Sequence, residues 1–147
     1  MEFPLAYGLE KVGLPLICTT DNLIFLVDTG ASNSVLFTYV YEHLKERFTD
    51  VSGGFQIMGM EGNYVDAPRV EGVINILDKD YKVKFTVYDG TKAFGNVQEK
   101  TGIQIHGILG IDFIVTNKWI LDFERFVVIE NEEKENVDSE AWISLKL

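Results

Sequence analysis

The stretch IFLVDTGASNSVLF (residues 24–37) places one carboxylate, Asp28, directly after four apolar residues. The run Ile24–Val27 is typical of a buried strand, because it is short, continuous and bounded by turn residues. Aspartate, threonine and glycine are common turn formers, so the triplet Asp28–Gly30 in isolation predicts only a turn. Whether Asp28 forms a turn or takes part in chemistry depends on the rest of the chain.

The composition limits the class of protein. A chain of 147 residues fits one domain that can bury its own core, and we treat residues 1–147 as a single domain with its core at about 14–129. A hydrophobic content of 46% excludes a disordered chain. The formal net charge of −10 opposes attraction to nucleic acid or to an anionic membrane. We therefore expect a peptide or protein ligand and no nucleic acid.

Other composition features exclude further classes. Cys18 is the single cysteine, so no internal disulfide can form, and we expect it to be a core residue. His43 and His106 have no partner at metal-ligand spacing, so the sequence predicts no metal and no other cofactor. No apolar run approaches the roughly 18 residues of a membrane span. These features favour a cytoplasmic location, unless a leader is missing.

Most of the chain has the pattern of β-strands. Hairpins are predicted for residues 14–27, 73–87 and 119–130, and in the second of them Tyr81, Val83, Phe85 and Val87 alternate toward one face. Residues 37–48 carry apolar side chains at helical spacing and predict the one amphipathic helix. Residues 130–140 predict a solvated acidic linker, and residues 141–147 a C-terminal strand.

A second glycine-containing motif occurs later in the chain. The sequence HGILGIDF (residues 106–113) holds two apolar residues and Gly110 before a predicted short helix. This pairing with the D-T-G-A of residues 28–31 resembles the retropepsins, the aspartic proteases of retroviruses, and their single-domain cellular and bacterial relatives. The resemblance implies a mainly β, closed-barrel acid-protease fold and an aspartic endopeptidase activity.

The resemblance also implies roles for individual residues. Asp28 is similar to the catalytic carboxylate, Thr29 to the residue that bonds across the two halves of the site, and Gly30 to the residue that lets substrate backbone approach. The segment MGMEGN (residues 58–63) stands where the family has its flap, a hairpin that closes over bound peptide. The residues expected to contact substrate are Ala31, Ser32, Ile57, Met58, Gly59, Met60, Gly62 and Ile108.

The chain departs from the retroviral pattern at two positions. Retroviral members carry an acidic residue after D-T-G-A and an arginine after the second glycine, whereas this chain has Ser32 and Ile111. The predicted helix after the Asp28 loop is longer than the remnant in the viral enzymes. The sequence is therefore more similar to the cellular and bacterial branch.

The catalytic mechanism of this class requires a second carboxylate. Peptide hydrolysis by this route needs two carboxylates that share one proton, and the chain has a single D-T-G. A homodimer brings a second Asp28 to its symmetry axis. Asp89, Asp112 and Asp122 are interpreted as turn or helix-cap residues. The alternative function is a catalytically silent peptide-binding or dimerisation module of the same fold.

Overall fold

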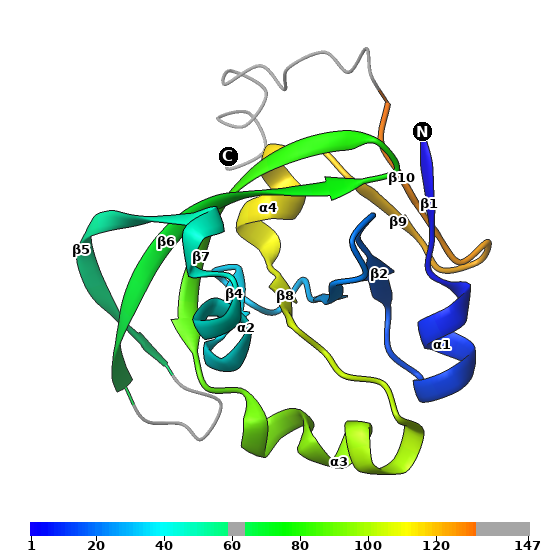
Figure 1. The fold of residues 1–147 in the computed structure, drawn as a ribbon. Helices are drawn as coiled ribbons and strands as arrows, with labels where there is room; N and C mark the ends of the chain where they lie inside the picture. The colour runs from blue at the N-terminus through cyan, green and yellow to red at the C-terminus, as the bar shows by residue number, and fades with distance from the viewer. Residues whose placement is uncertain (59–63, 132–147) are drawn as a thin grey trace, which may run out of the picture.

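The computed structural model describes residues 1–58 and 64–131, without the side chains of residues 52–58 and 64–66 (Figure 1). This part of the chain folds mainly as β-strands that form two sheets. The larger sheet has the order β2-β3-β8-β4-β7-β6-β5. Its strands are β2 (Leu16–Cys18), β3 (Ile24–Val27), β4 (Val35–Phe37), β5 (Phe48–Met58), β6 (Tyr64–Ile76), β7 (Lys79–Tyr88) and β8 (Gly107–Leu109).

The smaller sheet joins the two ends of the described chain. It has the order β1-β10-β9, with β1 (Glu2–Pro4), β9 (Ile120–Asp122) and β10 (Val127–Ile129) all antiparallel. In the larger sheet the pairs β3–β8 and β4–β7 are parallel and the other pairs are antiparallel. The parallel pairing of β3 with β8 brings the ends of these two strands, and the loops that follow them, side by side.

Four α-helices connect the strands in the described residues. They are α1 (Ala6–Val12), α2 (Thr38–His43), α3 (Thr91–Thr101) and α4 (Ile111–Thr116), and a 3₁₀ turn, Lys45–Arg47, follows α2. Figure 1 shows α3 along one edge of the molecule and α4 beside the long β6–β7 hairpin. None of the helices in this part of the chain is long and apolar enough to cross a membrane.

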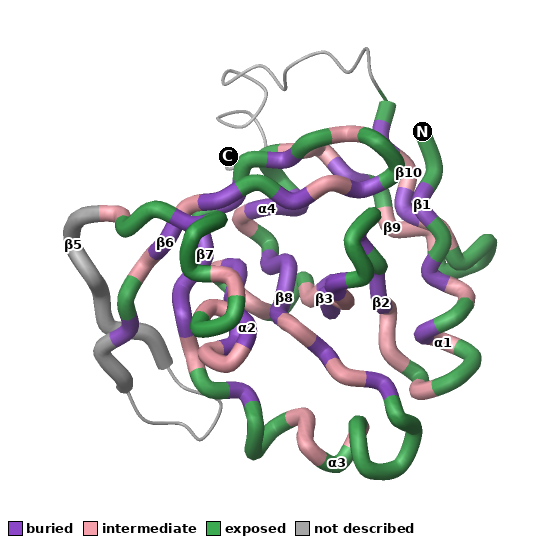
Figure 2. The backbone as a smooth tube through the Cα atoms, in the orientation of Figure 1, coloured by how far each residue is buried: buried purple, intermediate pink, exposed green. Residues whose placement is uncertain are grey.

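The core lies where the central strands face the small sheet and α4, and the buried segments in Figure 2 concentrate there. Phe25 on β3 stacks on Phe85 on β7 with ring centroids 5.6 Å apart. Phe113 on α4 meets Trp119 edge-on at 4.9 Å. Aromatic pairs of this kind add to the stabilisation that apolar burial provides. The first pair joins β3 to β7, and the second holds α4 against the residue that leads into β9.

The predicted hairpins are confirmed. β2 and β3 form the first, β6 and β7 the second, and β9 and β10 the third. The alternation predicted for β7 holds, because all four of its inward residues are buried: Tyr81, Val83, Phe85 and Val87.

The predicted helix at 37–48 is wrong in its bounds. Phe37 is fully buried in β4, where it pairs with Tyr88, and the helix begins only after it. α2 ends at His43, and Phe48 starts β5 and packs edge-on against Phe85 at 6.1 Å. Both phenylalanines fit the helical period, but burial between strands determines their conformation. Helices α1 and α3 were not predicted, and no residue of α3 is buried.

Three other features differ from the expectations. Cys18 is exposed on the edge strand β2, so the prediction of a core cysteine is wrong. Phe3 and Leu5, which precede the predicted core, are buried. Glu130, assigned to the solvated linker, is 4% exposed, accepts a hydrogen bond from Tyr81 and pairs with Lys79 at 3.0 Å. Residues 132–147, with the rest of that linker and the predicted last strand, lie outside the described residues.

Candidate active site

Asp28 is the first residue after β3 and is fixed by the neighbouring strand. Val27 pairs with Leu109 in the parallel ladder, and the backbone N–H of Asp28 donates to the carbonyl of Leu109 at 3.0 Å. The preceding residues Phe25–Val27 are buried, whereas Asp28 is half-buried. A buried strand therefore delivers a partly accessible carboxylate at its end.

The loop after Asp28 orients this carboxylate. The N–H of Gly30 donates to Asp28 Oδ1 at 2.8 Å, and the N–H of Ala31 donates to the Asp28 carbonyl at 3.2 Å. A Cβ atom at Gly30 would lie 3.2 Å from Asp28 Oδ1. That approach is tight, so a side chain at this position would press on the carboxylate. Thr29 and Gly30 are exposed and leave the loop open to a partner molecule.

The loop between β8 and α4 holds the Asp28 loop from the other side. The N–H of Ile111 donates to the Ala31 carbonyl at 2.8 Å, and the N–H of Gly110 donates to Ser34 Oγ at 3.0 Å. A Cβ at Gly110 would lie 2.7 Å from the Ala31 carbonyl oxygen. Only glycine allows the two loops to approach this closely.

A hydrogen-bonded pair between buried Ser34 and half-buried Asp112 completes this support. Asp112, in the first turn of α4, accepts the Ser34 N–H at 3.0 Å and the Ser34 hydroxyl at 2.9 Å. Asp112 was expected to cap or enter the helix. It does enter α4, but its carboxylate binds Ser34 and makes no cap bond. Sequence reasoning missed Ser34, because a serine before an apolar strand carries no signal of a partner 78 residues away.

The predicted substrate residues outside the flap differ in how far they are exposed. Ala31 is half-buried and Ser32 exposed in the Asp28 loop. Ile108 is 4% exposed, in β8 between Leu26 of β3 and Val35 of β4, so it is a core residue in the single chain.

The predicted flap is only partly within the described chain. Ile57 and Met58 lie in β5, where Met58 pairs with Tyr64 of β6, but their side chains are not described. Gly59, Met60 and Gly62 lie outside the described residues. The flap therefore stays a prediction.

The two histidines have local partners away from Asp28. His43 Nδ1 is 2.7 Å from the Tyr39 carbonyl oxygen. His106 Nδ1 accepts the N–H of Ile24 at 2.9 Å, and burial lowers the pKa of His106 while the Asp21 carboxylate acts in the opposite direction. The described residues contain no group of three or more histidine, cysteine, aspartate or glutamate side chains that could hold a metal ion.

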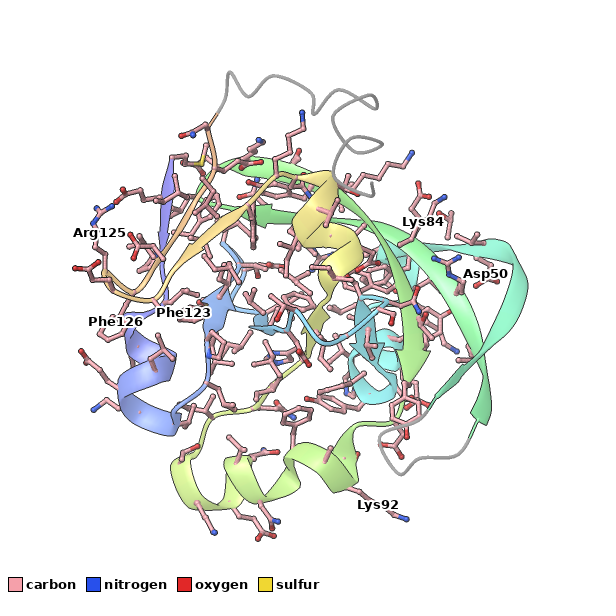
Figure 3. The ribbon with its side chains drawn as sticks, turned by 180° about the vertical axis from the view of Figure 1, so that it is seen from behind. Asp50, Lys84, Lys92, Phe123, Arg125 and Phe126 are labelled. Carbon is pink, nitrogen blue, oxygen red and sulfur yellow. The ribbon has the colours of Figure 1, made fainter. Side chains whose placement is uncertain are left out.

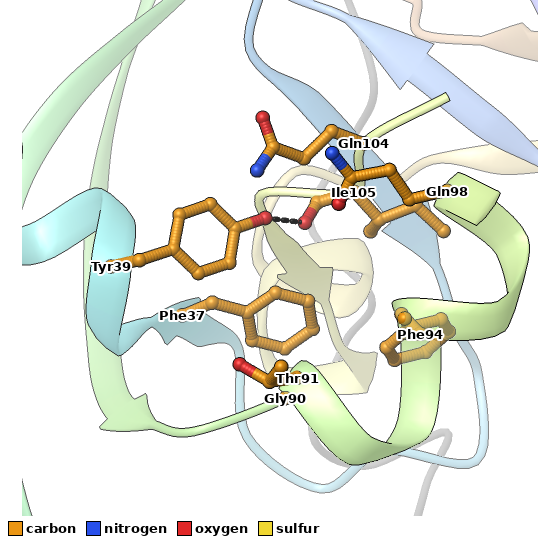
Figure 4. Close-up of a pocket in the computed structure, with 9 residues that line it drawn as sticks. Phe37, Tyr39, Gly90, Thr91, Phe94, Gln98, Gln104 and Ile105 are labelled. Atoms are coloured by element: carbon orange, nitrogen blue, oxygen red, sulfur yellow. Dashed lines mark hydrogen bonds between the residues drawn. The ribbon is translucent and has the colours of Figure 1, made fainter. Parts of the chain in front are cut away.

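A small pocket lies between α3 and the start of α2 (Figure 4). It has a volume of 210 Å³ and combines aromatic rings with amide side chains. The Tyr39 hydroxyl donates to the Ile105 carbonyl at its wall. Neither Asp28 nor Gly30 lines this pocket, so it is separate from the candidate active site.

Comparisons with known proteins identify the fold. No protein-family model and no curated protein matches the sequence. Among solved structures, the EIAV protease complexed with the inhibitor HBY-793 matches with a TM-score of 0.51 and 27% identity, over 70% of this chain and 86% of that one. The retroviral protease-like domain of Ddi1 from Leishmania major matches with a TM-score of 0.47 and 16% identity, over 84% and 93%.

The chain therefore has a retropepsin-like fold, as its two motifs predict. The expectation of a mainly β fold with a short helix after Ile108–Gly110 is confirmed. The closure of the sheet into a barrel stays a prediction.

Proposed function

We propose that this protein is an aspartic endopeptidase whose active site is completed by Asp28 of a second copy of the chain. The observation that carries the proposal is the geometry of Asp28. It stands at the end of a buried strand, held by Leu109 on one side and by the Gly30 N–H on the other, on a loop whose next residues are exposed. The retropepsin-like fold supports the same class of activity.

The proposed chemistry needs two such carboxylates. A pair of carboxyl groups in close contact holds one proton, because two negative charges at that distance repel strongly. The ionised group takes a proton from a water molecule, which attacks the peptide carbonyl carbon. The protonated group donates to the carbonyl oxygen. The carboxyl group that took the proton from water then donates it to the amide nitrogen, and the other carboxylate takes back a hydroxyl proton as the tetrahedral species collapses. The C–N bond breaks, the amine and the carboxylic acid leave, and the pair again holds one proton.

The other candidate aspartates already have structural partners. Asp112 uses both carboxylate oxygens for Ser34. Asp89 Oδ1 accepts the Thr91 N–H at 3.0 Å, and Asp122 Oδ1 accepts two N–H groups in the β9–β10 turn. This arrangement favours a second Asp28 over a second aspartate of the same chain. In the dimer, Thr29 is proposed to bond across the axis.

The proposed substrate is an extended peptide. Main-chain pairing with strand edges gives affinity, and apolar pockets for alternate side chains give specificity. Ile57, Met58, Met60 and Ile108 are proposed as pocket walls. Ile108 requires a change in its surroundings on dimerisation or binding, because its side chain is buried in the single chain.

The test is hydrolysis of an unfolded protein such as casein between pH 4 and 7. We expect Asp28→Asn to lower turnover at least ~10²-fold, while Asp89→Asn, a matched change at an exposed turn, leaves it unchanged. Equal turnover by Asp28→Asn would refute the mechanism. A folded dimer that binds peptide but cleaves nothing would support the catalytically silent module instead.

A further inference from the structure

A groove between α4 and the β6–β7 hairpin is lined by three basic side chains. It has a volume of about 510 Å³, and Arg69, Lys82 and Lys84 lie along it. Figure 3 shows Lys84 beside this hairpin, far from Lys92 on α3. In the whole chain 23 acidic residues outnumber 13 basic ones, so the groove differs in charge from the chain as a whole.

The two carboxylates that also line the groove cannot pair with both of its lysines. Asp112 directs both of its oxygens to Ser34. Glu71 pairs with Lys82 at 2.8 Å, and the pKa of Glu71 is lowered first by this hydrogen bond and further by the charges of Lys82 and Lys84. One carboxylate thus serves two ammonium groups. The Lys82 side chain is 76% exposed, so it is accessible to a further carboxylate.

The chain itself contains a segment of the opposite charge directly after the described residues. Residues 132–140 include five aspartate or glutamate side chains and one lysine. Because most of the protein is acidic as well, such a segment is repelled by most of the surface and attracted to a basic groove. A partner in the same chain also has an advantage over a free one, since its effective concentration is on the order of millimolar.

The acidic segment starts close to the groove. Glu130 is 4% exposed and pairs at 3.0 Å with Lys79, the first residue of β7. Lys82 and Lys84 follow on the same strand, and at ~3.3 Å per residue β7 advances only ~17 Å from Lys79 to Lys84. Residues 132–140 can span up to ~30 Å when extended, which is enough to reach both lysines.

No neighbouring strand of the described residues blocks the path from Glu130 to the groove. Glu130 bonds to Tyr81, which is buried, whereas the two lysines of the groove alternate to the opposite face of β7 and are exposed. In the larger sheet β7 lies between β6 and β4, and β4 pairs with it only at residues 86–88. The other edge of β7 is therefore uncovered by any described strand at residues 79–84, and a chain can pass around it from one face to the other.

From these observations we infer that the acidic residues 132–140 bind in cis to the groove beside α4, through Lys82 and Lys84. Exposed ion pairs of this kind are individually weak, but several of them in one chain, continuing from the Glu130–Lys79 pair, act together. The contact weakens as salt is added, because exposed charges are screened. It is independent of the peptidase activity proposed above.

The first test is zero-length cross-linking of the whole chain with a carbodiimide, which joins a lysine to a carboxylate in direct contact with it. We expect links from Lys82 or Lys84 to carboxylates of residues 132–140, identified by mass spectrometry. The Lys82–Glu71 pair is the positive control, and Lys100 on α3 is the negative control. A mixture of isotopically labelled and unlabelled chains separates links within one chain from links between two.

The second test is the initial rate of trypsin cleavage after Lys134, the one basic residue of the acidic segment. This rate follows the fraction of chains in which the segment is released from the groove. We expect the double variant Lys82→Gln/Lys84→Gln to be cleaved at least ~3-fold faster than the wild type at low ionic strength. The matched control, Lys92→Gln/Lys100→Gln, removes two charges from α3 and should keep the wild-type rate.

Three outcomes would overturn the inference. Absence of links between the groove lysines and residues 132–140, while the Lys82–Glu71 link forms, would leave the groove to an acidic partner from outside the chain. Links found only between labelled and unlabelled chains would assign it to a second copy. Equal rates of cleavage after Lys134 in the wild type and in Lys82→Gln/Lys84→Gln would show that the two lysines do not hold the segment.

Discussion

The carboxylate of Asp112 accepts two hydrogen bonds from Ser34, one from its backbone N–H at 3.0 Å and one from its hydroxyl at 2.9 Å. Ser34 Oγ in turn accepts the N–H of Gly110. Because Ser34 is fully buried, these bonds replace water for its hydroxyl group and its backbone N–H. They join the loop after Asp28 to the start of α4.

Removal of this pair should loosen the site. Asp112→Ala leaves the buried Ser34 N–H and hydroxyl without their acceptor, so we expect a loss of ~1–3 kcal/mol in the free energy of unfolding, measured in urea. Ser32→Ala, an exposed serine of the same loop, is the control and should stay within ~0.5 kcal/mol. Similar small values for both variants would show that the Ser34–Asp112 pair contributes little.

Two glycines should respond to alanine in opposite directions. At Gly110 a Cβ would lie 2.7 Å from a carbonyl oxygen, so Gly110→Ala should lower the melting temperature and the activity together. At Gly95 in α3 a Cβ meets nothing within 4 Å. Gly95→Ala should therefore stabilise the helix by ~0.5–1 kcal/mol. A Gly110→Ala protein as stable as wild type would contradict the close approach of the two loops.

The His106 imidazole should make stability depend on pH. Its ring accepts the Ile24 N–H and lies near the Tyr39 ring and the Asp21 carboxylate; burial is the main cause of its lowered pKa. Below pH ~6.5 the unfolded chain binds a proton that the folded chain resists. The free energy of unfolding should therefore fall as the pH drops through this range.

Substitution of His106 isolates its contribution to the pH dependence of the free energy of unfolding. We expect His106→Gln to show a flatter dependence of unfolding free energy between pH 5 and 7.5 than the wild type, and His43→Gln, at the exposed histidine, to follow the wild-type curve. Parallel curves for wild type and His106→Gln would assign the dependence to other groups.

The Tyr81–Glu130 contact should stabilise the small sheet against the β6–β7 hairpin. The pKa of Tyr81 is raised, mainly by burial and further by the Glu130 carboxylate. Tyr81→Phe removes the donor and leaves a buried carboxylate with Lys79, so we expect ~1–3 kcal/mol of destabilisation in urea. Tyr41→Phe, whose hydroxyl is 3.4 Å from Asp50, should change stability by less than ~0.5 kcal/mol. Equal effects would rule out a special role for Glu130.

The sequence predicts the features that depend on neighbouring residues. The alternation along β7 and the turns of the three hairpins are local patterns, and the structure confirms them. The two glycine motifs predict the retropepsin-like fold through resemblance. Helix bounds are less predictable, because Phe37 and Phe48 fit a helical period but belong to the strands β4 and β5.

Long-range contacts account for most of what the sequence could not predict. Ser34 and Asp112 meet only because β3 and β8 run in parallel, and Glu130 is buried only because β10 brings it to Tyr81. α3 has no buried residue and thus no strong apolar stripe to reveal it. The exposure of Cys18 follows from the place of β2 at a sheet edge, which its apolar neighbours in sequence do not indicate.

The stoichiometry of a statine-type transition-state analogue, measured by isothermal titration calorimetry, tests the shared Asp28 site most directly. An assembled carboxylate pair should bind the analogue far more tightly than it binds substrate. We predict one inhibitor for every two chains, and no tight binding by an Asp28→Asn protein that remains dimeric. One inhibitor per chain, or equally tight binding by Asp28→Asn, would contradict a site formed by two copies of Asp28.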